Sequence, residues 1–207
     1  MTVRKLAALV LCLALLVVLL SGCTQQTEHT TKRISALFPR YTLATATATA
    51  GEIVYGKVTA KSHATEVIEE VRYKMVDGER KQIVRGECYS TVTVEVIDCV
   101  KGGLEPGDTI TYREYGGETA RRTWIYEYTT PVSVGDTILF FKSGTGEGVL
   151  SPDLFWRVEN PDSIYVSNDI LPAGIPNPDT TRYHPVEMSL ETFLNGIRAE
   201  LNGVRTG

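Results

Sequence analysis

Apolar and polar side chains alternate along two segments near the middle of the chain. Val92, Val94 and Val96 fall on one face of the first segment, with threonine and glutamate side chains between them. Ile110 and Tyr112 follow the same alternation after a glycine-rich turn. A period of two is typical of a β-strand with one buried face. This part of the chain therefore predicts a strand, a turn and a second strand.

Further strands are predicted from the same pattern and from the turn residues that separate them. Glycine, aspartate and asparagine at the boundaries supply the backbone conformations that turns need. One of these segments, residues 138–142, is almost continuously apolar, which predicts a strand central to the sheet. The proline-containing segment 168–186 is expected to wrap the surface without regular structure. The predicted strands are residues 52–60, 121–128, 138–142, 154–158 and 164–166.

Residues 67–85 are expected to form a long hairpin. Val67, Val71, Tyr73 and Met75 would share one face, and the Asp77-Gly78 pair supplies a turn with positive φ. Between residues 66 and 85 five acidic side chains are balanced by five basic ones. This balance predicts a solvated, protruding ribbon rather than a basic binding patch.

Two helices are predicted, one at each end of the folded region. The alternation of threonine and alanine in residues 41–50 also fits a strand, but the alanine content favours a short helix. For the C-terminal helix, residues 187–203, Ser189 is a good N-cap and Gly203 a suitable stop. Its apolar stripe consists of Leu190, Phe193, Leu194, Ile197 and Leu201.

Together these elements predict a mainly β fold, a partly open Greek-key β-barrel of the OB-like type with the C-terminal helix packed on it. The order of valine-rich strand, Lys-Gly turn, Pro-Gly-Asp turn, Gly-Gly pair and Val-Gly-Asp strand resembles a group of uncharacterised exported bacterial proteins with OB-like barrels. The resemblance implies a fold but no activity. It is carried by Val92–Lys101, Pro106–Tyr112, Gly116-Gly117 and Val134–Phe141.

The N-terminus predicts export. Arg4 and Lys5 precede 15 apolar residues that end at Leu20. As a helix this run would measure about 22 Å, whereas a bilayer core of about 30 Å needs about 20 residues. The length therefore favours a signal peptide, residues 1–22, over a permanent membrane span.

The residues at the end of this segment, Leu20-Ser21-Gly22-Cys23, resemble the lipobox of bacterial lipoproteins. The resemblance implies that Cys23 carries a diacylglycerol and is the first residue of the mature protein. An ordinary secretory signal is the alternative. The expected product is a protein anchored in the cell membrane by lipid and facing the outside of the cytoplasm. It would have a flexible tether over residues 23–40 and a single domain over residues 41–207.

Charge and cysteine content limit the possible partners. The signal peptide holds 2 of the 21 basic and none of the 25 acidic residues, so the mature charge is 19 − 25 = −6. This acidic balance argues against nucleic-acid binding. Cys88 and Cys99 remain after Cys12 leaves with the signal peptide and Cys23 is lipidated. A straight strand would hold them about 36 Å apart at about 3.3 Å per residue, so free thiols are favoured over a disulfide.

The sequence contains no recognisable catalytic or metal-binding motif. His29, His63 and His184 are isolated, and no nucleophile elbow, phosphate loop or dinucleotide fingerprint is present. We therefore expect no catalytic residues, no metal and no cofactor. An enzyme of unrecognised type stays open as a third hypothesis.

The most suggestive chemistry is aromatic. Trp124, Tyr126 and Tyr128 alternate on one predicted strand, beside Arg122, and Tyr112 and Tyr115 precede them. An exposed aromatic face could stack on sugar rings or anchor a protein, and the alternative is that this face forms the core. The expected function is that of a non-catalytic binding module for an envelope glycan or an envelope protein. The alternative is an inhibitor or accessory subunit that engages a partner through the 67–85 hairpin. The candidate ligand-binding residues are Tyr112, Arg122, Trp124, Tyr126 and Tyr128.

Overall fold

The computed structural model describes residues 29–35, 38–127, 129–176 and 185–203. The predicted signal peptide, the lipidation site Cys23, Tyr128 and His184 lie outside these ranges. The described chain is mainly β with a C-terminal helix, as predicted. No helix within the described ranges is both long enough and apolar enough to cross a bilayer.

The main sheet is antiparallel and has six strands. The order is β3-β4-β2-β8-β9, and β5 pairs with β4 outside this path. The sheet is not closed, so the predicted barrel is not confirmed. Isolated bridges do bring Arg113 of β5 to Gly148 and Lys142 of β8 to Val149. The strands are β2 (Ala50–Lys61), β3 (Thr65–Val76), β4 (Glu79–Lys101), β5 (Thr109–Tyr115), β8 (Thr137–Ser143) and β9 (Phe155–Arg157).

Strands β2 and β8 contribute side chains to two cores, and burial on both faces explains the almost continuous apolar sequence of β8. Leu139 and Phe141 face one core, together with residues of the two helices, α2 (Leu43–Thr49) and α3 (Leu190–Leu201). Ile138 and Phe140 face a second core. The valines of β4 that first predicted a strand, Val92, Val94 and Val96, lie in this second core.

Both predicted helices are present. Thr42 and Thr45 form a capping box at the start of α2, which favours the helix over the strand that Thr–Ala alternation also allowed. Ser189 caps α3 by accepting a hydrogen bond from the backbone N–H of Thr192. Gly203 follows the helix with a φ of 68°. Four residues of the predicted apolar stripe are buried and hold α3 on the sheet, whereas Leu201, at the end of the helix, is 38% exposed.

A smaller sheet was only partly foreseen. It has the order β1-β7-β6, formed by β1 (Thr30–Ile34), β7 (Arg122–Tyr126) and β6 (Gly117–Glu118). The tether was expected to be irregular throughout, and β1 corrects this expectation because it pairs in parallel with β7 over five residues.

The C-terminal segment before α3 adds short elements. These are the 3-10 turns η1 (Pro152–Leu154) and η2 (Asn168–Ile170) and the pair of strands β10 (Ile164–Val166) and β11 (Val186–Met188). The predicted irregular segment 168–186 thus contains η2 and the first residue of β11.

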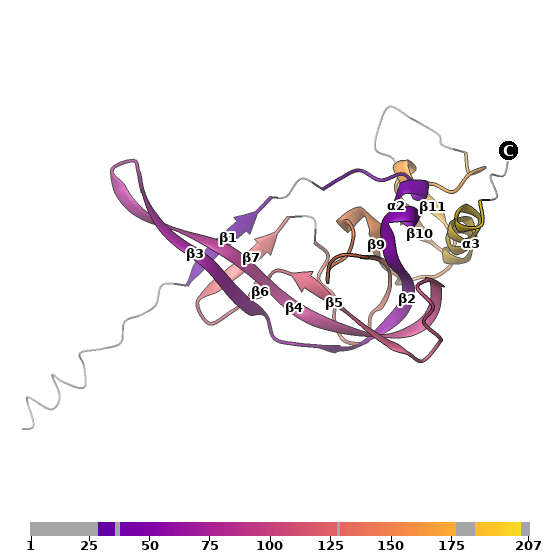
Figure 1. Ribbon diagram of the computed structural model, residues 1–207, viewed down its shortest axis with the longest axis horizontal. Coiled ribbons are helices and arrows are strands. Elements are labelled where there is room, and N and C mark those ends of the chain that lie inside the picture. Colours follow the sequence, from indigo (N-terminus) through magenta and orange to yellow (C-terminus); the bar gives the residue numbers. More distant parts are fainter. Residues whose placement is uncertain (1–28, 36–37, 128, 177–184, 204–207) are drawn as a thin grey trace, which may run out of the picture.

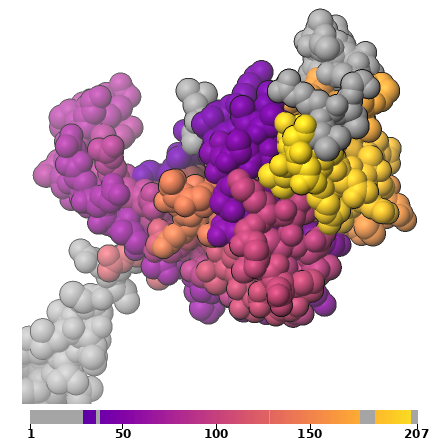
Figure 2. Space-filling view, turned by 45° about the vertical axis from the view of Figure 1, so that its right-hand side comes forward, coloured from indigo at the N-terminus to yellow at the C-terminus, as the bar shows by residue number. Residues whose placement is uncertain are grey.

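Strand β4 is longer than predicted. It was expected to end near residue 85 and begin again at residue 91, but it is continuous for 23 residues. Its first part pairs only with β3, across the Asp77-Gly78 turn, whose φ angles are 54° and 81°. We call this two-stranded projection, residues 67–87, the arm. Figure 1 shows the arm at the opposite end of the molecule from α2 and α3, and Figure 2 shows it standing clear of the body.

A β-bulge in the arm corrects one predicted face. The register shifts between Ile68 and Glu70, so that Val71 pairs with Val84 while Val67 pairs with Glu87. Paired residues share a face and successive residues alternate, so Val67 lies on the opposite face from Val71. The apolar face of the arm consists of Ile68, Val71, Tyr73 and Met75.

Candidate binding cleft and the base of the arm

A cleft of about 530 Å³ opens where the two sheets meet. The connection between β2 and β3, the end of β5 and the strand β7 form its walls. We call it the tyrosine cleft because Tyr115 and Tyr126 lie in it side by side. It is lined by Lys61, Ser62, His63, Ala64, Ser90, Glu114, Tyr115, Gly116, Gly117, Glu118, Thr123, Trp124, Ile125, Tyr126, Thr129 and Pro131.

Tyr115 and Tyr126 are half-buried and present part of each ring to the cleft. Their ring centroids are 5.5 Å apart and the planes are tilted by 40°. Burial raises the pKa of both phenols above its ordinary value. Both hydroxyls therefore stay protonated at neutral pH and remain hydrogen-bond donors.

The glycine pair between β5 and β7 makes this arrangement possible. Gly116 and Gly117 have φ angles of 105° and 125°, which side chains other than glycine rarely adopt. A Cβ on Gly116 would lie 3.2 Å from the Trp124 carbonyl oxygen, and one on Gly117 would lie 2.7 Å from the Cβ of Ala64. The Gly-Gly motif of the sequence thus shapes one wall of the cleft.

A charged pair ties the walls of the cleft together. Lys61 Nζ lies 2.5 Å from Glu114 Oε1 and also donates to the Val132 carbonyl at 2.8 Å. The other carboxylate oxygen of Glu114 accepts from the Val132 backbone N–H at 2.7 Å. Both oxygens of this largely buried carboxylate are engaged within the protein, so Glu114 holds the β5 end and the segment at Val132 together. His63 and Glu118 are exposed at the rim.

Two of the predicted ligand-binding residues brace the arm instead of facing solvent. Trp124 is only 2% exposed, and its Nε1 donates to Glu66 Oε1 at 3.0 Å. Arg122 Nη1 donates to the same oxygen at 2.7 Å. Glu66 belongs to β3 and the other two belong to β7, so this cluster joins the small sheet to the base of the arm.

Strand β1 completes this brace. Lys32 Nζ lies 4.3 Å from the centre of the Trp124 ring and donates to the Val84 carbonyl at 2.5 Å. Burial lowers the pKa of Lys32, repulsion by Arg122 adds to the effect, and Glu66 opposes it. The sequence left open whether the Trp124 ring is exposed or packed inside the protein, and the structure shows it packed inside.

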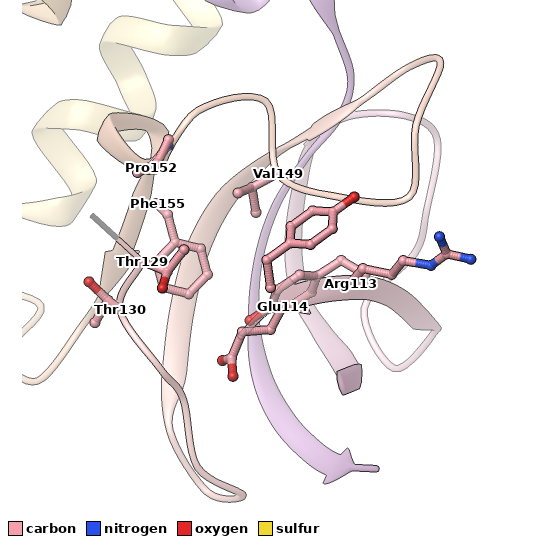
Figure 3. A pocket seen from close by; sticks show the side chains of 9 residues that line it. Arg113, Glu114, Thr129, Thr130, Val149, Pro152 and Phe155 are labelled. Atoms are coloured by element: carbon pink, nitrogen blue, oxygen red, sulfur yellow. The ribbon is translucent and has the colours of Figure 1, made fainter. Parts of the chain in front are cut away.

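Tyr112 also lies inside the molecule. It is 3% exposed and packs on Phe140 at a centroid distance of 4.9 Å. It borders a small pocket of about 40 Å³. Figure 3 shows Phe155, Val149 and Pro152 around this pocket, and shows Arg113 and Glu114 pointing to opposite sides of β5. The Tyr112 hydroxyl has no hydrogen-bond partner among the described residues, and burial raises its pKa.

The thiols and the histidine do not assemble a reactive centre in the described part of the chain. Cys88 and Cys99 are free, as favoured from the sequence. Burial raises the pKa of the Cys88 thiol, and nearby Glu66 raises it further, so this thiol is protonated at neutral pH. No three histidine, cysteine, aspartate or glutamate side chains come close enough within the described ranges to hold a metal ion.

Of the five predicted residues, the structure brings Trp124 and Tyr126 together at the tyrosine cleft, with only Tyr126 open to it. Arg122 serves the brace and Tyr112 the core. The sequence did not place Lys32 and Glu66 in the candidate set, because nothing local in it shows that β1 pairs with β7 or that the Glu66 side chain of β3 reaches β7. No family model, curated protein or solved structure matches the chain.

Proposed function

We propose that the protein is a lipid-anchored, extracytoplasmic and non-catalytic binding module whose tyrosine cleft binds an envelope glycan. The observation that carries the proposal is the pair of half-exposed rings, Tyr115 and Tyr126, in the wall of the cleft. Aromatic rings stack on the apolar faces of sugars, and exposed polar groups at the rim, such as His63 and Glu118, can hydrogen-bond to sugar hydroxyls.

The same proposal includes a fold that approaches a partly open Greek-key barrel of the OB-like type. The isolated bridge between Arg113 and Gly148 brings strand β5 close to the segment that follows β8. Closure there would complete a partly open OB-like barrel around the second core. Such barrels bind oligomers on one sheet face and its loops, which is support by analogy of fold.

The anchor in this proposal is a diacylglycerol on Cys23, following the resemblance of residues 20–23 to a lipobox. A membrane attachment at the N-terminus is compatible with the described domain, since β1 lies beside the base of the arm and away from α2 and α3 (Figure 1).

A second candidate function is an inhibitor or accessory subunit that engages a protein through the 67–85 hairpin. The observation in its favour is the exposed apolar face of the arm, where Tyr73 and Met75 are 57% and 62% exposed. Large apolar side chains grouped in this way often mark an interaction site.

The test of the glycan proposal compares Tyr126→Leu with a matched variant. Tyr126→Leu keeps an apolar side chain but removes the ring, so the mature protein should lose most of its co-sedimentation with cell-wall glycan. Tyr165→Leu, which removes a tyrosine 60% exposed outside the cleft, should leave binding unchanged. Equal binding by the two variants, or no binding by the wild type, would refute the glycan proposal.

A further inference from the structure

The arm is a ribbon without a third strand. Strand β5 begins to pair with β4 only at Tyr89, and beyond that point β3 and β4 pair only with each other. A two-stranded ribbon is marginally stable by itself in water. Three of the side chains on its apolar face, Val71, Tyr73 and Met75, are 44%, 57% and 62% exposed. A surface that covers this face would therefore stabilise the arm.

The charges of the arm are separated along its length. Residues 71–84, from the Val71–Val84 pair to the tip, form the distal arm and contain four basic and two acidic side chains, a net charge of 4 − 2 = +2. The whole chain has a net charge of −4, so the remainder carries −4 − 2 = −6. The base of the arm holds Glu66, Glu69, Glu70 and Glu87, and one basic residue, Arg85, which pairs with Glu70 in the register. The sequence count of equal charges was correct, but the fold places most of the basic ones toward the tip.

The basic residues of the distal arm gather mainly on the face opposite the apolar one. Lys74 pairs directly with Lys81 in the β register, and Arg72 lies on the same face with its partner Ile83, which is 45% exposed. Two of these cations have acidic partners at the surface, since Arg72 lies 2.5 Å from Glu70 and Lys81 lies 4.0 Å from Glu79. Like charges opposite each other destabilise a ribbon, so a negatively charged surface would reduce the repulsion that remains between Lys74 and Lys81. On the apolar face Arg80 stacks on Tyr73 at 4.2 Å. The distal arm is thus amphipathic and positive, while the rest of the molecule is acidic.

The path of the chain places this arm near the expected anchor. Six residues separate Cys23 from Thr30, the first residue of β1. They span at most about 25 Å when fully extended. Lys32 of β1 holds Val84 at the base of the arm, and the tip at Asp77 lies about 20 Å further along the strand. The tether is thus about as long as the distal arm, so an anchored Cys23 keeps the arm within reach of the membrane.

We propose that the arm is a membrane-contact element, whose apolar face enters the headgroup region of the bilayer that holds Cys23 and whose basic side chains bind anionic phospholipid headgroups. This inference rests on the lipid anchor of the proposed function. Tyrosine favours the membrane interface, and long lysine and arginine side chains reach phosphates while their stems follow apolar surface. The arm would lie along the surface rather than enter tip first, because the tip carries Asp77 and Glu79.

The test uses the mature lipoprotein in vesicles and a fluorophore sensitive to polarity. The label is placed at Met75→Cys, and the matched control label at Val134→Cys, because both positions are 62% exposed in the native protein. A Cys99→Ser background removes the accessible native thiol, and Cys88 is buried. In vesicles of phosphatidylcholine with phosphatidylglycerol, the label at 75 should shift to shorter wavelength, and lipid-borne nitroxide should quench it. The label at 134 should do neither.

The contribution of charge is tested in a second experiment. Each basic residue near an anionic surface contributes about 1 kcal/mol, or roughly a fivefold change in equilibrium. Lys74→Gln with Lys81→Gln should therefore shift the docking equilibrium about 25-fold toward the undocked state. The same pair of substitutions should have little effect in vesicles of phosphatidylcholine alone.

The possible failures are distinguishable, because flotation of the protein with vesicles reports the anchor and the label at 75 reports the arm. A protein that floats while this label keeps its aqueous emission overturns the arm proposal and leaves the anchor standing. A protein that carries no diacylglycerol and does not float overturns both. A label that responds only when envelope proteins are added identifies a protein partner and overturns the bilayer as the occupant.

Discussion

Glu66→Gln tests whether the brace holds the arm on the body. One carboxylate oxygen of Glu66 accepts from both Arg122 and Trp124, at 2.7 and 3.0 Å. The side chains of Arg122 and Glu66 are only 17% and 13% exposed. Loss of one partner from a buried pair costs about 3–5 kcal/mol. Glutamine retains an acceptor oxygen, which offsets part of this loss, so we expect the free energy of unfolding to fall by about 2–3 kcal/mol.

The assay is urea unfolding followed by tryptophan fluorescence, since Trp124 lies in the brace. Glu69→Gln is the matched control, because Glu69 is an exposed residue in the bulged part of the same strand. A surface substitution of this kind should change stability by no more than about 0.5 kcal/mol. If Glu66→Gln destabilises the protein no more than Glu69→Gln, the brace does not hold the arm on the body.

The remaining predictions concern the core and the thiols. Tyr112→Phe removes a buried hydroxyl without a partner, so thermal unfolding should show equal or greater stability, by up to about 1 kcal/mol. Burial raises the pKa of Tyr112 in the folded state, so above about pH 10 the Tyr112 hydroxyl loses its proton first in the unfolded state. The free energy of unfolding should therefore fall with rising pH in that range, and it should fall less in Tyr112→Phe. Gly56→Ala places a Cβ 2.5 Å from the Glu95 carbonyl oxygen and should cost about 1–3 kcal/mol in urea unfolding, whereas Gly146→Ala meets only ordinary contacts. A thiol reagent should modify half-buried Cys99 well before Cys88 in the native protein, and equal rates would contradict the burial of Cys88.

Local patterns predicted those elements whose burial is periodic. The alternating valines of β4, the apolar run of β8 and the first four residues of the α3 stripe are buried along their length. Strand β1 has no such pattern, because its sequence is short and mostly polar. It is a strand only because it pairs with β7, which lies about ninety residues later in the chain. A contact of this range leaves no signal in the local sequence.

The absence of a local signal for long-range contacts also explains which parts of the candidate site the sequence could not predict. Alternation correctly placed Trp124 and Tyr126 on one strand, but it could not show that Lys32 covers the Trp124 ring. The bulge near Glu69 likewise shifted Val67 to the other face. Its one sequence marker lies on the partner strand, where Gly86 pairs with Ile68 and a Cβ would clash with the Val67 carbonyl oxygen. The Gly116-Gly117 pair, in contrast, was visible as a motif, and the positive φ angles give its physical reason.

The brace also decides which substitution can test a ligand site. Trp124 carries the indole with the greatest stacking surface on β7, and the sequence made it the natural residue to remove. Its ring contacts Lys32 and its N–H bonds Glu66, so Trp124→Ala would open a cavity and release the base of the arm. A loss of glycan binding in that variant would follow from a displaced β7 as readily as from a lost stacking ring. Tyr126 lies two residues further along the same strand, outside the brace and open to the cleft, so its removal separates recognition from folding.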